Sequence, residues 1–180
     1  MHARPYDERD QPGLVDLVQA VAALGGAVGF LSVPTPAEVE AWREGLRAEL
    51  LVVVDDQDRV LGCGALRRPA NPVLRAIGEI TKVMTHPDCR GQGVGRVVMD
   101  ALVELAIAQG AELLTLECRG NNHGAQRLYA QAGFVMTGRR PDAIAVGDDR
   151  FDQVLMHRDL RTGTAGLRRF GSRREGSGSS

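Results

Sequence analysis

The segment Gly78–Gly95 reads GEITKVMTHPDCRGQGVG, and the interpretation of the whole chain starts from it. Its first half predicts a β-strand over Ile77–His86, because β-branched residues are frequent there and a proline follows. Its second half places three alternate glycines directly before a helical pattern: Gly91, Gly93 and Gly95. Glycine lets backbone N–H groups approach an anion closely, and a helix N-terminus carries roughly half a positive charge. The segment therefore predicts a phosphate-binding loop, flanked by the charges of Arg90 and Arg96.

This segment resembles the acetyl-CoA core of the GCN5-related N-acetyltransferase (GNAT) superfamily. Arg90, Gly93 and Gly95 fit the superfamily signature R/Q-x-x-G-x-G/A, and the later segment Leu128–Phe134 has the form L-Y-x-x-x-G-F. The resemblance extends from about Leu14 to Leu160. It implies that acetyl-CoA is the co-substrate, bound by residues of the central strand, the glycine loop and a later helix: Val83, Thr85, Arg90, Gly91, Gln92, Gly93, Val94, Gly95, Arg96, Asn122 and Tyr129.

A dinucleotide-binding loop is the main alternative for the same glycines. Its fingerprint, G-x-G-x-x-G, follows a strand directly, and an acidic residue stands about 20 residues further on. Glu117 could be that acid, but Arg96 stands where the last glycine belongs, and Thr85–Arg90 separate the strand from the loop. Acyl-CoA is therefore favoured over NAD, although the glycines alone would also fit a simple strand-to-helix turn.

The composition predicts one globular domain with a basic tail. The chain has 180 residues, 43% hydrophobic and 25% charged, which is ordinary for a soluble domain. Residues 161–180 contain five Arg and one Glu, hence a charge of +4, which leaves −5 for residues 1–160 out of the total of −1. We expect the domain over residues 1–160 and a disordered tail, rich in Gly and Ser, over residues 161–180. The nearly neutral total argues against nucleic acid as a partner.

Neither a membrane segment nor a metal site is expected. The N-terminal residues lack the apolar core of a signal peptide, and no apolar run approaches the ~18 residues of a membrane span. A cytoplasmic location without a membrane partner is therefore expected. The three cysteines show no metal-ligand spacing, and no His/Cys/Asp cluster suggests a metal. The oligomeric state stays open between a monomer and a homodimer.

The spacing of apolar residues predicts an α+β fold. Helices are expected over Pro12–Leu24, from Thr35-Pro36 to about Leu50, from the glycine loop to Gly110, and from Asn121-Asn122 to Gly133. Strands are expected over Leu50–Val54, Val60–Leu66, Ile77–His86, Ala111–Cys118, Phe134–Arg140 and Phe151–Leu160, with a long loop between the last two. This order is typical of a mixed, mostly antiparallel sheet with helices on both faces. In the GNAT superfamily the sheet is splayed centrally and pantetheine lies in the gap; a β-bulge near Val83 would fit the mixed pattern of the central strand.

Two glutamates are candidates for the base that acetyl transfer to an amine requires. An alkyl ammonium has a pKa near ~10.4, so its proton must be removed before the nitrogen can attack. Glu79 lies on the central strand, where many GNAT relatives carry a catalytic glutamate, and Glu117 ends the neighbouring strand. Together the two carboxylates would attract a cationic acceptor. The alternative for Glu79 is a solvent-facing strand residue without a catalytic role.

A narrower resemblance, to the tabtoxin resistance protein subgroup, involves the same two acids. It also covers the connection Gly26–Phe30, which we expect to be mobile or to face the substrate, and Trp42 in the following helix. The two catalytic acids of the subgroup fall at Glu79 and Glu117, although the second of them is an aspartate there. The resemblance does not imply that this protein acetylates the same acceptor as the subgroup.

Tyr129 is the candidate acid of the reaction. Its place on the apolar stripe of a helix would suit a core aromatic, but in the superfamily the tyrosine of this motif points its hydroxyl at the CoA sulfur. A phenol with a pKa near ~10 is protonated at neutral pH and can donate to the departing thiolate. Asn122 is a candidate helix cap and, as in relatives, a CoA contact, while His86 and His123 are alternative bases.

The sequence thus predicts an acetyl-CoA-dependent N-acetyltransferase that acts directly on a primary amine of a small molecule, such as a toxin, an antibiotic or an amino-acid-like compound. Two alternatives stay open. One is a peptide or protein N-acetyltransferase, for which the basic tail could serve as a pseudosubstrate. The other is a non-catalytic acyl-CoA-binding module.

Overall fold

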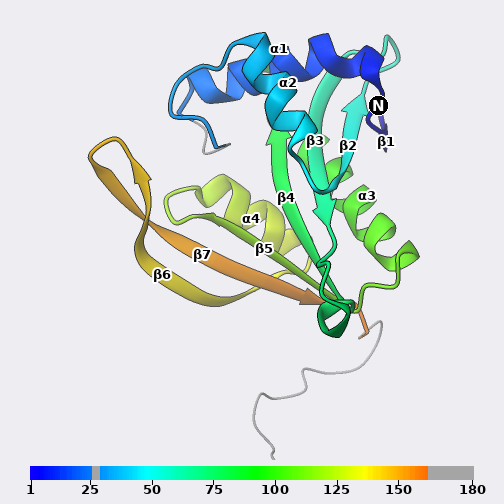
Figure 1. Cartoon of the computed structure of the whole chain (residues 1–180), viewed down its shortest axis with the longest axis vertical. Helices are drawn as coiled ribbons and strands as arrows, with labels where there is room; N and C mark the ends of the chain where they lie inside the picture. The colour runs from blue at the N-terminus through cyan, green and yellow to red at the C-terminus, as the bar shows by residue number, and fades with distance from the viewer. Residues whose placement is uncertain (26–28, 162–180) are drawn as a thin grey trace, which may run out of the picture.

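Seven strands form one sheet in the computed structural model, which describes residues 1–25 and 29–161 (Figure 1). The strands are β1 His2–Pro5, β2 Glu49–Val54, β3 Val60–Arg67, β4 Ile77–Thr85, β5 Leu113–Arg119, β6 Val135–Val146 and β7 Asp149–Asp159. The helices are α1 Gln11–Ala23, α2 Pro36–Glu44, α3 Val94–Ala108 and α4 His123–Gln131, with short 3-10 turns η1 Glu8–Asp10, η2 Pro72–Leu74 and η3 Pro87–Cys89. The expected tail and the middle of the connection between the first two helices lie outside the described residues.

The strand order is β1-β2-β3-β4-β5-β7-β6, and only β4 and β5 run parallel. Parallel neighbours need a crossover connection, and α3 provides it here. The expected α+β fold with a mixed, mostly antiparallel sheet and helices on both faces is therefore confirmed. Within the described part of the chain, no helix is long and apolar enough to cross a membrane.

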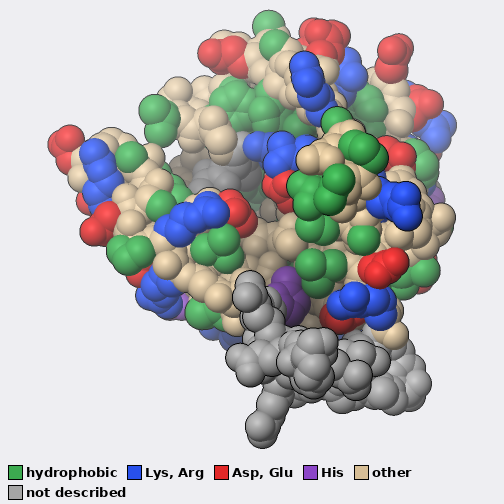
Figure 2. All heavy atoms as spheres, turned by 60° about the horizontal axis from the view of Figure 1, so that its bottom comes forward, with side chains coloured by type: hydrophobic (Ala, Val, Ile, Leu, Met, Phe, Trp, Pro, Cys, Tyr) green, Lys and Arg blue, Asp and Glu red, His purple; other side chains and the backbone are tan. Residues whose placement is uncertain are grey.

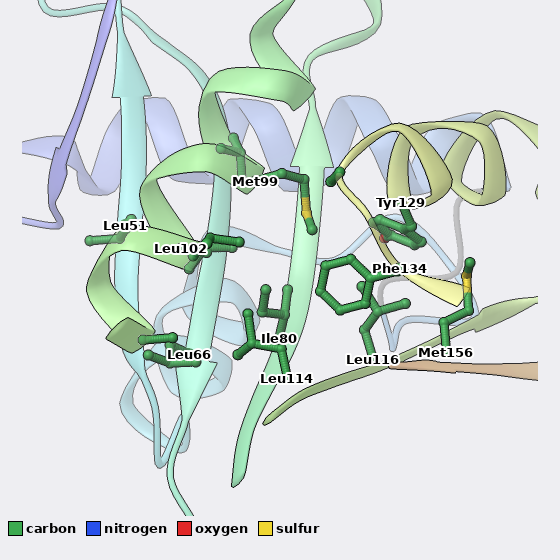
Figure 3. Close-up of a cluster of buried hydrophobic side chains, with 14 of the residues drawn as sticks. Leu51, Leu66, Ile80, Met99, Leu102, Leu114, Leu116, Tyr129, Phe134 and Met156 are labelled. Carbon is green, nitrogen blue, oxygen red and sulfur yellow. The ribbon is translucent and has the colours of Figure 1, made fainter. Parts of the chain in front are cut away.

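Strand β2 shows why both faces of the sheet are covered. Leu51 and Val53 belong to the core packed against α3 and α4, whereas Val52 and Val54 belong to the core packed against α1 and α2. Because successive side chains point to opposite faces of a strand, a continuous apolar run requires helices on both sides. Figure 3 shows the first of these cores, with Leu102 of α3 lying over the strands.

The sequence does not predict β1, which pairs with β2 at one edge of the sheet. Its residues have little β propensity, and proline in a strand is confined to edges and ends. A partly buried ion pair holds the strand to the turn that follows it. The Arg4 guanidinium donates two hydrogen bonds of 2.7 Å to the carboxylate of Asp10, which is 3% exposed.

The β6–β7 hairpin is longer than predicted and projects from the body of the molecule (Figure 1). The residues between Arg140 and Phe151 include proline, aspartates and glycine, which favour turns and predict a long loop. In the structure the strands continue through them, with an irregular register between Arg140 and Ile144 and a tight turn at Gly147, where φ is 58°. Helix α2, in contrast, is shorter than predicted, because Gly45 follows it directly.

Candidate active site

The candidate site lies where β4 and β5 separate. The two strands pair only at their beginnings, from Ile77↔Leu113 to Glu79↔Thr115. Beyond this point β5 continues to pair with β7, and β4 with β3. The facing edges of β4 and β5 therefore have no strand between them, and their backbone groups are available to an extended ligand. The expected central splay is present.

A β-bulge accompanies the splay. On β3 the register advances by two residues, from Cys63 to Ala65, while on β4 it advances by three, from Met84 to Thr81. The extra residue is Lys82, whose φ of 58° is uncommon for a residue other than glycine. The bulge expected near Val83 is therefore confirmed, one residue earlier, and it turns the Lys82 side chain toward Trp42 of α2.

A cleft of about 160 Å³ occupies the splay. Residues of β4, β5, α4 and the connection before α2 line it: Gly29, Ile80, Thr81, Lys82, Val83, Glu117, Cys118, Arg119, Asn122 and Tyr129. Val83, Glu117, Asn122 and Tyr129 are residues that the sequence predicts for the site, and the structure brings them together. Gly29 belongs to the connection that the sequence predicts to be mobile or to face the substrate.

The glycine loop begins just beyond the end of β4. Gly91 and Gly93 have φ values of 77° and 84°, and a Cβ atom added at either would meet open space. Gly95 is different, because a Cβ there would lie 3.0 Å from Leu128 of α4 and 3.5 Å from the Thr85 hydroxyl. Gly91 and Gly93 thus shape the loop, and Gly95 lets α3 pack closely against α4 and the end of β4.

The N–H groups of this loop are free to bind an anion. Among the described residues, four of them have no hydrogen-bond acceptor: those of Gly91, Gly93, Val94 and Gly95. Gly93 is the N-cap of α3 and has no side chain to cap it. The Arg90 side chain is exposed, while Arg96 pairs with Asp100 at 2.8 Å. Gln92 bonds back to the Asp88 carbonyl at 3.0 Å, so its amide is engaged within the loop.

Tyr129 is both a core residue and a cleft residue. Its side chain is 7% exposed and packs near Phe134, at 6.4 Å between ring centroids (Figure 3). Burial raises the pKa of the Tyr129 phenol, and the neighbouring Cys118 thiol acts in the same direction. The hydroxyl is therefore protonated at neutral pH. Asn122 caps α4, since its Oδ1 accepts a hydrogen bond of 3.1 Å from the Ala125 N–H.

The two candidate glutamates occupy different places. Glu117 lines the cleft and is 42% exposed; its carboxylate accepts hydrogen bonds from Arg140, at 3.4 Å, and from Gln153. Glu79 is not among the lining residues. It lies where β4 and β5 are still paired, is 35% exposed, and accepts a 3.1 Å hydrogen bond from Arg67. Each carboxylate thus has an arginine partner.

The two histidines considered as bases do not line the cleft. His86 is buried, with its Nδ1 accepting a hydrogen bond from the Asp88 N–H and its Nε2 lying 3.4 Å from Asp16. His123 is exposed at the start of α4. No group of three His, Cys, Asp or Glu residues that could hold a metal occurs among residues 1–25 and 29–161.

Two cations in the cleft, Lys82 and Arg119, are not predicted as site residues by the sequence. A signal for the first exists, because Lys82 is the only lysine in the chain and every other basic residue apart from histidine is arginine. Lysine is a compact charge whose pKa responds to burial, whereas arginine stays charged everywhere. The single lysine of the chain, placed in the central strand, therefore indicates that this position needs a lysine rather than an arginine.

A profile of the Acetyltransferase (GNAT) family matches residues 25–134, a range that contains the splay, the glycine loop and α4. The chain belongs to this family. Among solved structures, one from Salmonella typhimurium contains its cofactor acetyl-CoA and superposes on this GNAT chain with a TM-score of 0.74, at 21% identity. The superposition covers 91% of this chain and 95% of the Salmonella chain. The ribosomal-protein-alanine N-acetyltransferase of Brucella melitensis superposes with a TM-score of 0.75, at 19% identity, over 89% of this chain and all of its own. At these identities the structures show the shared fold.

Two sequence relatives of this GNAT chain differ in what they acetylate. The L-methionine sulfoximine/L-methionine sulfone acetyltransferase of Pseudomonas paraeruginosa is 27% identical over 140 residues, which are 72% of the chain and 80% of that relative. The ribosomal protein bS18-alanine N-acetyltransferase of Escherichia coli is 31% identical over 74 residues, which are 41% of the chain. The match spans only half the length of the latter relative.

Proposed function

We propose that this GNAT domain transfers an acetyl group from acetyl-CoA directly to the primary amine of a small molecule. The observation that carries the proposal is the pairing of two binding features at one end of β4. One is a cleft between the facing edges of β4 and β5, which separate beyond Glu79, and the other is a loop with four N–H groups that have no acceptor among the described residues. The first suits an extended chain with a reactive end, and the second suits phosphate.

The residues present fit acetyl-CoA, which supplies the acetyl group as a thioester. The free N–H groups of the glycine loop would hold the pyrophosphate, with Arg90 and Arg96 adding positive charge. The edge of β4 from Val83 to Thr85 would pair with pantetheine as an added strand does. Asn122 and Tyr129 line the same cleft from α4.

The cleft also provides groups for the two proton transfers. In the reaction a bond forms between the amine nitrogen and the carbonyl carbon, and the carbon–sulfur bond breaks. We propose that Glu117 takes the proton of the amine directly, or that Glu79, outside the lining, takes it through one water molecule. Tyr129 is proposed to donate its proton to the sulfur that leaves.

A small-molecule acceptor is favoured over a peptide by the extent of the two sequence matches. The relative named for methionine sulfoximine covers most of both chains, whereas the ribosomal-protein relative matches over a short segment. Detoxification of an amine-containing toxin or antibiotic is the setting that we propose. A peptide N-terminus stays the second candidate, because the ribosomal-protein-alanine N-acetyltransferase of Brucella melitensis superposes over 89% of this chain and all of its own.

The proposal is tested by measuring thiol release from acetyl-CoA against a panel of amines. The panel contains L-methionine sulfoximine, L-methionine sulfone, the common amino acids, simple alkyl amines and a peptide with an N-terminal alanine. We expect turnover with at least one small amine and little with the peptide. Turnover with the peptide alone would favour the second candidate. Tight acetyl-CoA binding with no turnover in any reaction would support the non-catalytic module.

A further inference from the structure

The cleft holds a lysine ammonium without an anionic partner among the described residues. Lys82 is half-buried at the bulge, and its Nζ lies 5.6 Å from the centre of the Trp42 ring. Within the part of the chain that the structure describes, this ammonium has no hydrogen-bond acceptor and no carboxylate partner. The contact with the Trp42 ring compensates only in part for the hydration that the ammonium loses on burial. The left-handed backbone at Lys82 is also unfavourable for a residue with a Cβ, so its position is maintained by the surrounding fold.

A second cation faces the same cleft from the other strand. The Arg119 guanidinium stacks over the Phe151 ring, at 4.8 Å from its centroid, and donates a 3.1 Å hydrogen bond to the Gly25 carbonyl. These two contacts fix the group in place. Its Nε–H is buried and has no acceptor among the described residues. An arginine presents five N–H donors in a planar fork that matches an oxyanion, and most of them are unused here.

The acidic side chain that lines the cleft, Glu117, in contrast already has partners in Arg140 and Gln153. Glu79, which lies outside the lining, pairs with Arg67. Among the described residues of the cleft, the charges without an ionic partner are therefore positive, on Lys82 and Arg119. Figure 2 shows the hollow between the projecting hairpin and the helices of α1 and α2, with basic and acidic side chains both at its edge. The sequence predicts attraction for a cationic acceptor, but paired carboxylates attract a cation weakly.

We propose that Lys82 and Arg119 bind a carboxylate of the acceptor, so that the acceptor of the acetyl transfer is an amine that also carries an acid group. The inference rests on the proposed function, and it names the substrate class. The two cations come from opposite walls of the splay, β4 and β5, so that the acid group would bridge them. Glu117 and Arg119 are two residues apart on β5, and such side chains share a face about 7 Å apart. An amino acid or an analogue of one can place its amine near the first and its acid near the second.

The electrostatics of Lys82 support this assignment. Burial lowers the pKa of the Lys82 ammonium, and the neighbouring Arg67 cation acts in the same direction. A bound carboxylate would replace the missing water and offset this penalty. Lysine rather than arginine at this position leaves room for a ligand, because its ammonium is compact.

Binding measurements can test the proposal without turnover. The protein is first saturated with CoA. Calorimetry then measures the affinity for each common amino acid, for L-methionine sulfone and for L-methionine sulfoximine, and compares it with the affinity for the carboxamide of the same compound. We expect at least one acid to bind about 10- to 100-fold more tightly than its amide, the effect of one charged hydrogen-bonding contact. Lys82→Met and Arg119→Gln should each remove most of this preference, while Lys82→Arg should retain part of it. Arg9→Met, which removes an exposed cation that pairs with Asp7 near the N-terminus, is the matched control.

The single lysine allows a second, direct measurement. Reductive methylation with ¹³C-formaldehyde labels only Lys82 and the N-terminal amine, so one side-chain signal reports the ammonium. The acid ligand should raise the pKa of that signal, because a bound anion favours the charged form, and the amide should not. This result would assign the contact to Lys82 even if a variant failed to fold.

The possible outcomes separate this inference from the proposed function. If no acid in the panel binds more tightly than its amide, the carboxylate site is refuted, whether or not amines are acetylated. If amines are acetylated and the amides react as well as the acids, the proposed acetyl transfer is supported and the carboxylate site is refuted. If an acid binds at Lys82 and no amine is acetylated, the carboxylate site is supported and the proposed acetyl transfer is refuted.

Discussion

Gly91 and Gly93 give the glycine loop its shape, because both adopt a left-handed backbone that residues with a Cβ rarely take. Neither glycine packs against another group, so steric contact within the protein does not explain its presence. What both positions share is exposure beside N–H groups that have no acceptor. A ligand that approaches the backbone closely would account for this combination.

Gly93→Val should therefore weaken acetyl-CoA binding at least about tenfold, through steric exclusion of the pyrophosphate from the N–H groups. Isothermal calorimetry measures the affinity. The substitution also strains the left-handed backbone by about 1–2 kcal/mol, so the control variant must carry the same strain at a position away from the loop. Gly110→Val is that control, since Gly110 has a φ of 73°, open space around it, and a place at the other end of α3. Equal acetyl-CoA affinities in the two variants would remove the loop from the proposed site.

Glu79→Gln and Glu117→Gln rank the two candidate bases. Each substitution preserves shape and removes the ability to take a proton. We expect the variant of the true base to lose roughly 10²–10⁴-fold in kcat with acetyl-CoA affinity unchanged. The loss should shrink at high pH, where more of the amine is already neutral. Glu104→Gln, at an exposed site on α3, is the control and should keep full activity.

The position of Glu117 in the lining of the cleft favours it as the direct base, whereas Glu79 would need an intervening water. A large loss for Glu79→Gln alone, with Glu117→Gln near the parent, would assign the base to Glu79. Full activity in both variants across pH 6 to 9 would mean that another group takes the proton, and His86 and His123 would be the next to test.

The first strand is a case in which tertiary contacts form an element without local propensity. Asp10→Asn should lower the free energy of unfolding by roughly 3 kcal/mol at pH 7, because it removes the buried carboxylate that accepts two hydrogen bonds from Arg4 and leaves Arg4 only the exposed Asp58 as a charged partner. Asp58→Asn is a matched control, since Asp58 also contacts Arg4, at 3.3 Å, but is exposed. It should cost less than about 1 kcal/mol. Chemical denaturation of both variants measures these differences.

The effect of Asp10 should also depend on pH with a definite sign. Burial alone would raise the pKa of Asp10, but hydrogen bonds from Arg4 and from the Asp7 N–H, together with the Arg4 charge, bring it below its ordinary value of 3.8. A carboxylate with a lowered folded-state pKa stabilises the fold above its unfolded pKa, and this contribution disappears as the pH falls through the folded pKa. The difference in the free energy of unfolding between the parent and Asp10→Asn should thus be largest above about pH 4 and should decrease as the pH falls below that value. A gap that stays constant down to pH 2 would show that packing, not charge, is lost.

The sequence predicts elements well where the apolar pattern is local. Helix α3, β4 and the alternating core of β2 follow from residues within one window. Strand β1 does not, because its partner β2 lies far away in the sequence. The outer half of the β6–β7 hairpin pairs locally, but its proline, aspartates and glycine favour turns and hide the strands. The same limit applies to the site. Glu117 and Tyr129 can be found from motif context, whereas the partners Arg140 and Arg67, which neutralise the two glutamates, depend on strand register.

Charge is divided unevenly over the whole chain, with +4 in residues 161–180 and −5 in residues 1–160. The acidic excess of the domain could attract the basic segment, but surface attraction between exposed charges is weak and screened by salt. A segment of Gly, Ser and Arg also offers little apolar area to bury. The composition therefore predicts that residues after Arg161 add little to the stability of the domain.

Two truncations test where the fold ends. A chain that stops after Arg161 should unfold within about 0.5 kcal/mol of the parent, since it keeps every contact of the described residues. A chain that stops after Asp159 loses Leu160, which packs against the core under α3 and donates its N–H to the Glu112 carbonyl at 2.9 Å. We expect that second truncation to cost about 1–3 kcal/mol, mainly the effect of one apolar side chain and one hydrogen bond, because the exposed ion pairs of Arg161 that it also removes contribute little. If the first truncation already lowers the melting temperature as much as the second, Leu167 and Phe170 contribute to the core. If it instead leaves stability unchanged and speeds the acetylation of basic peptides, the tail acts as a pseudosubstrate, and the peptide acceptor gains over the small amine.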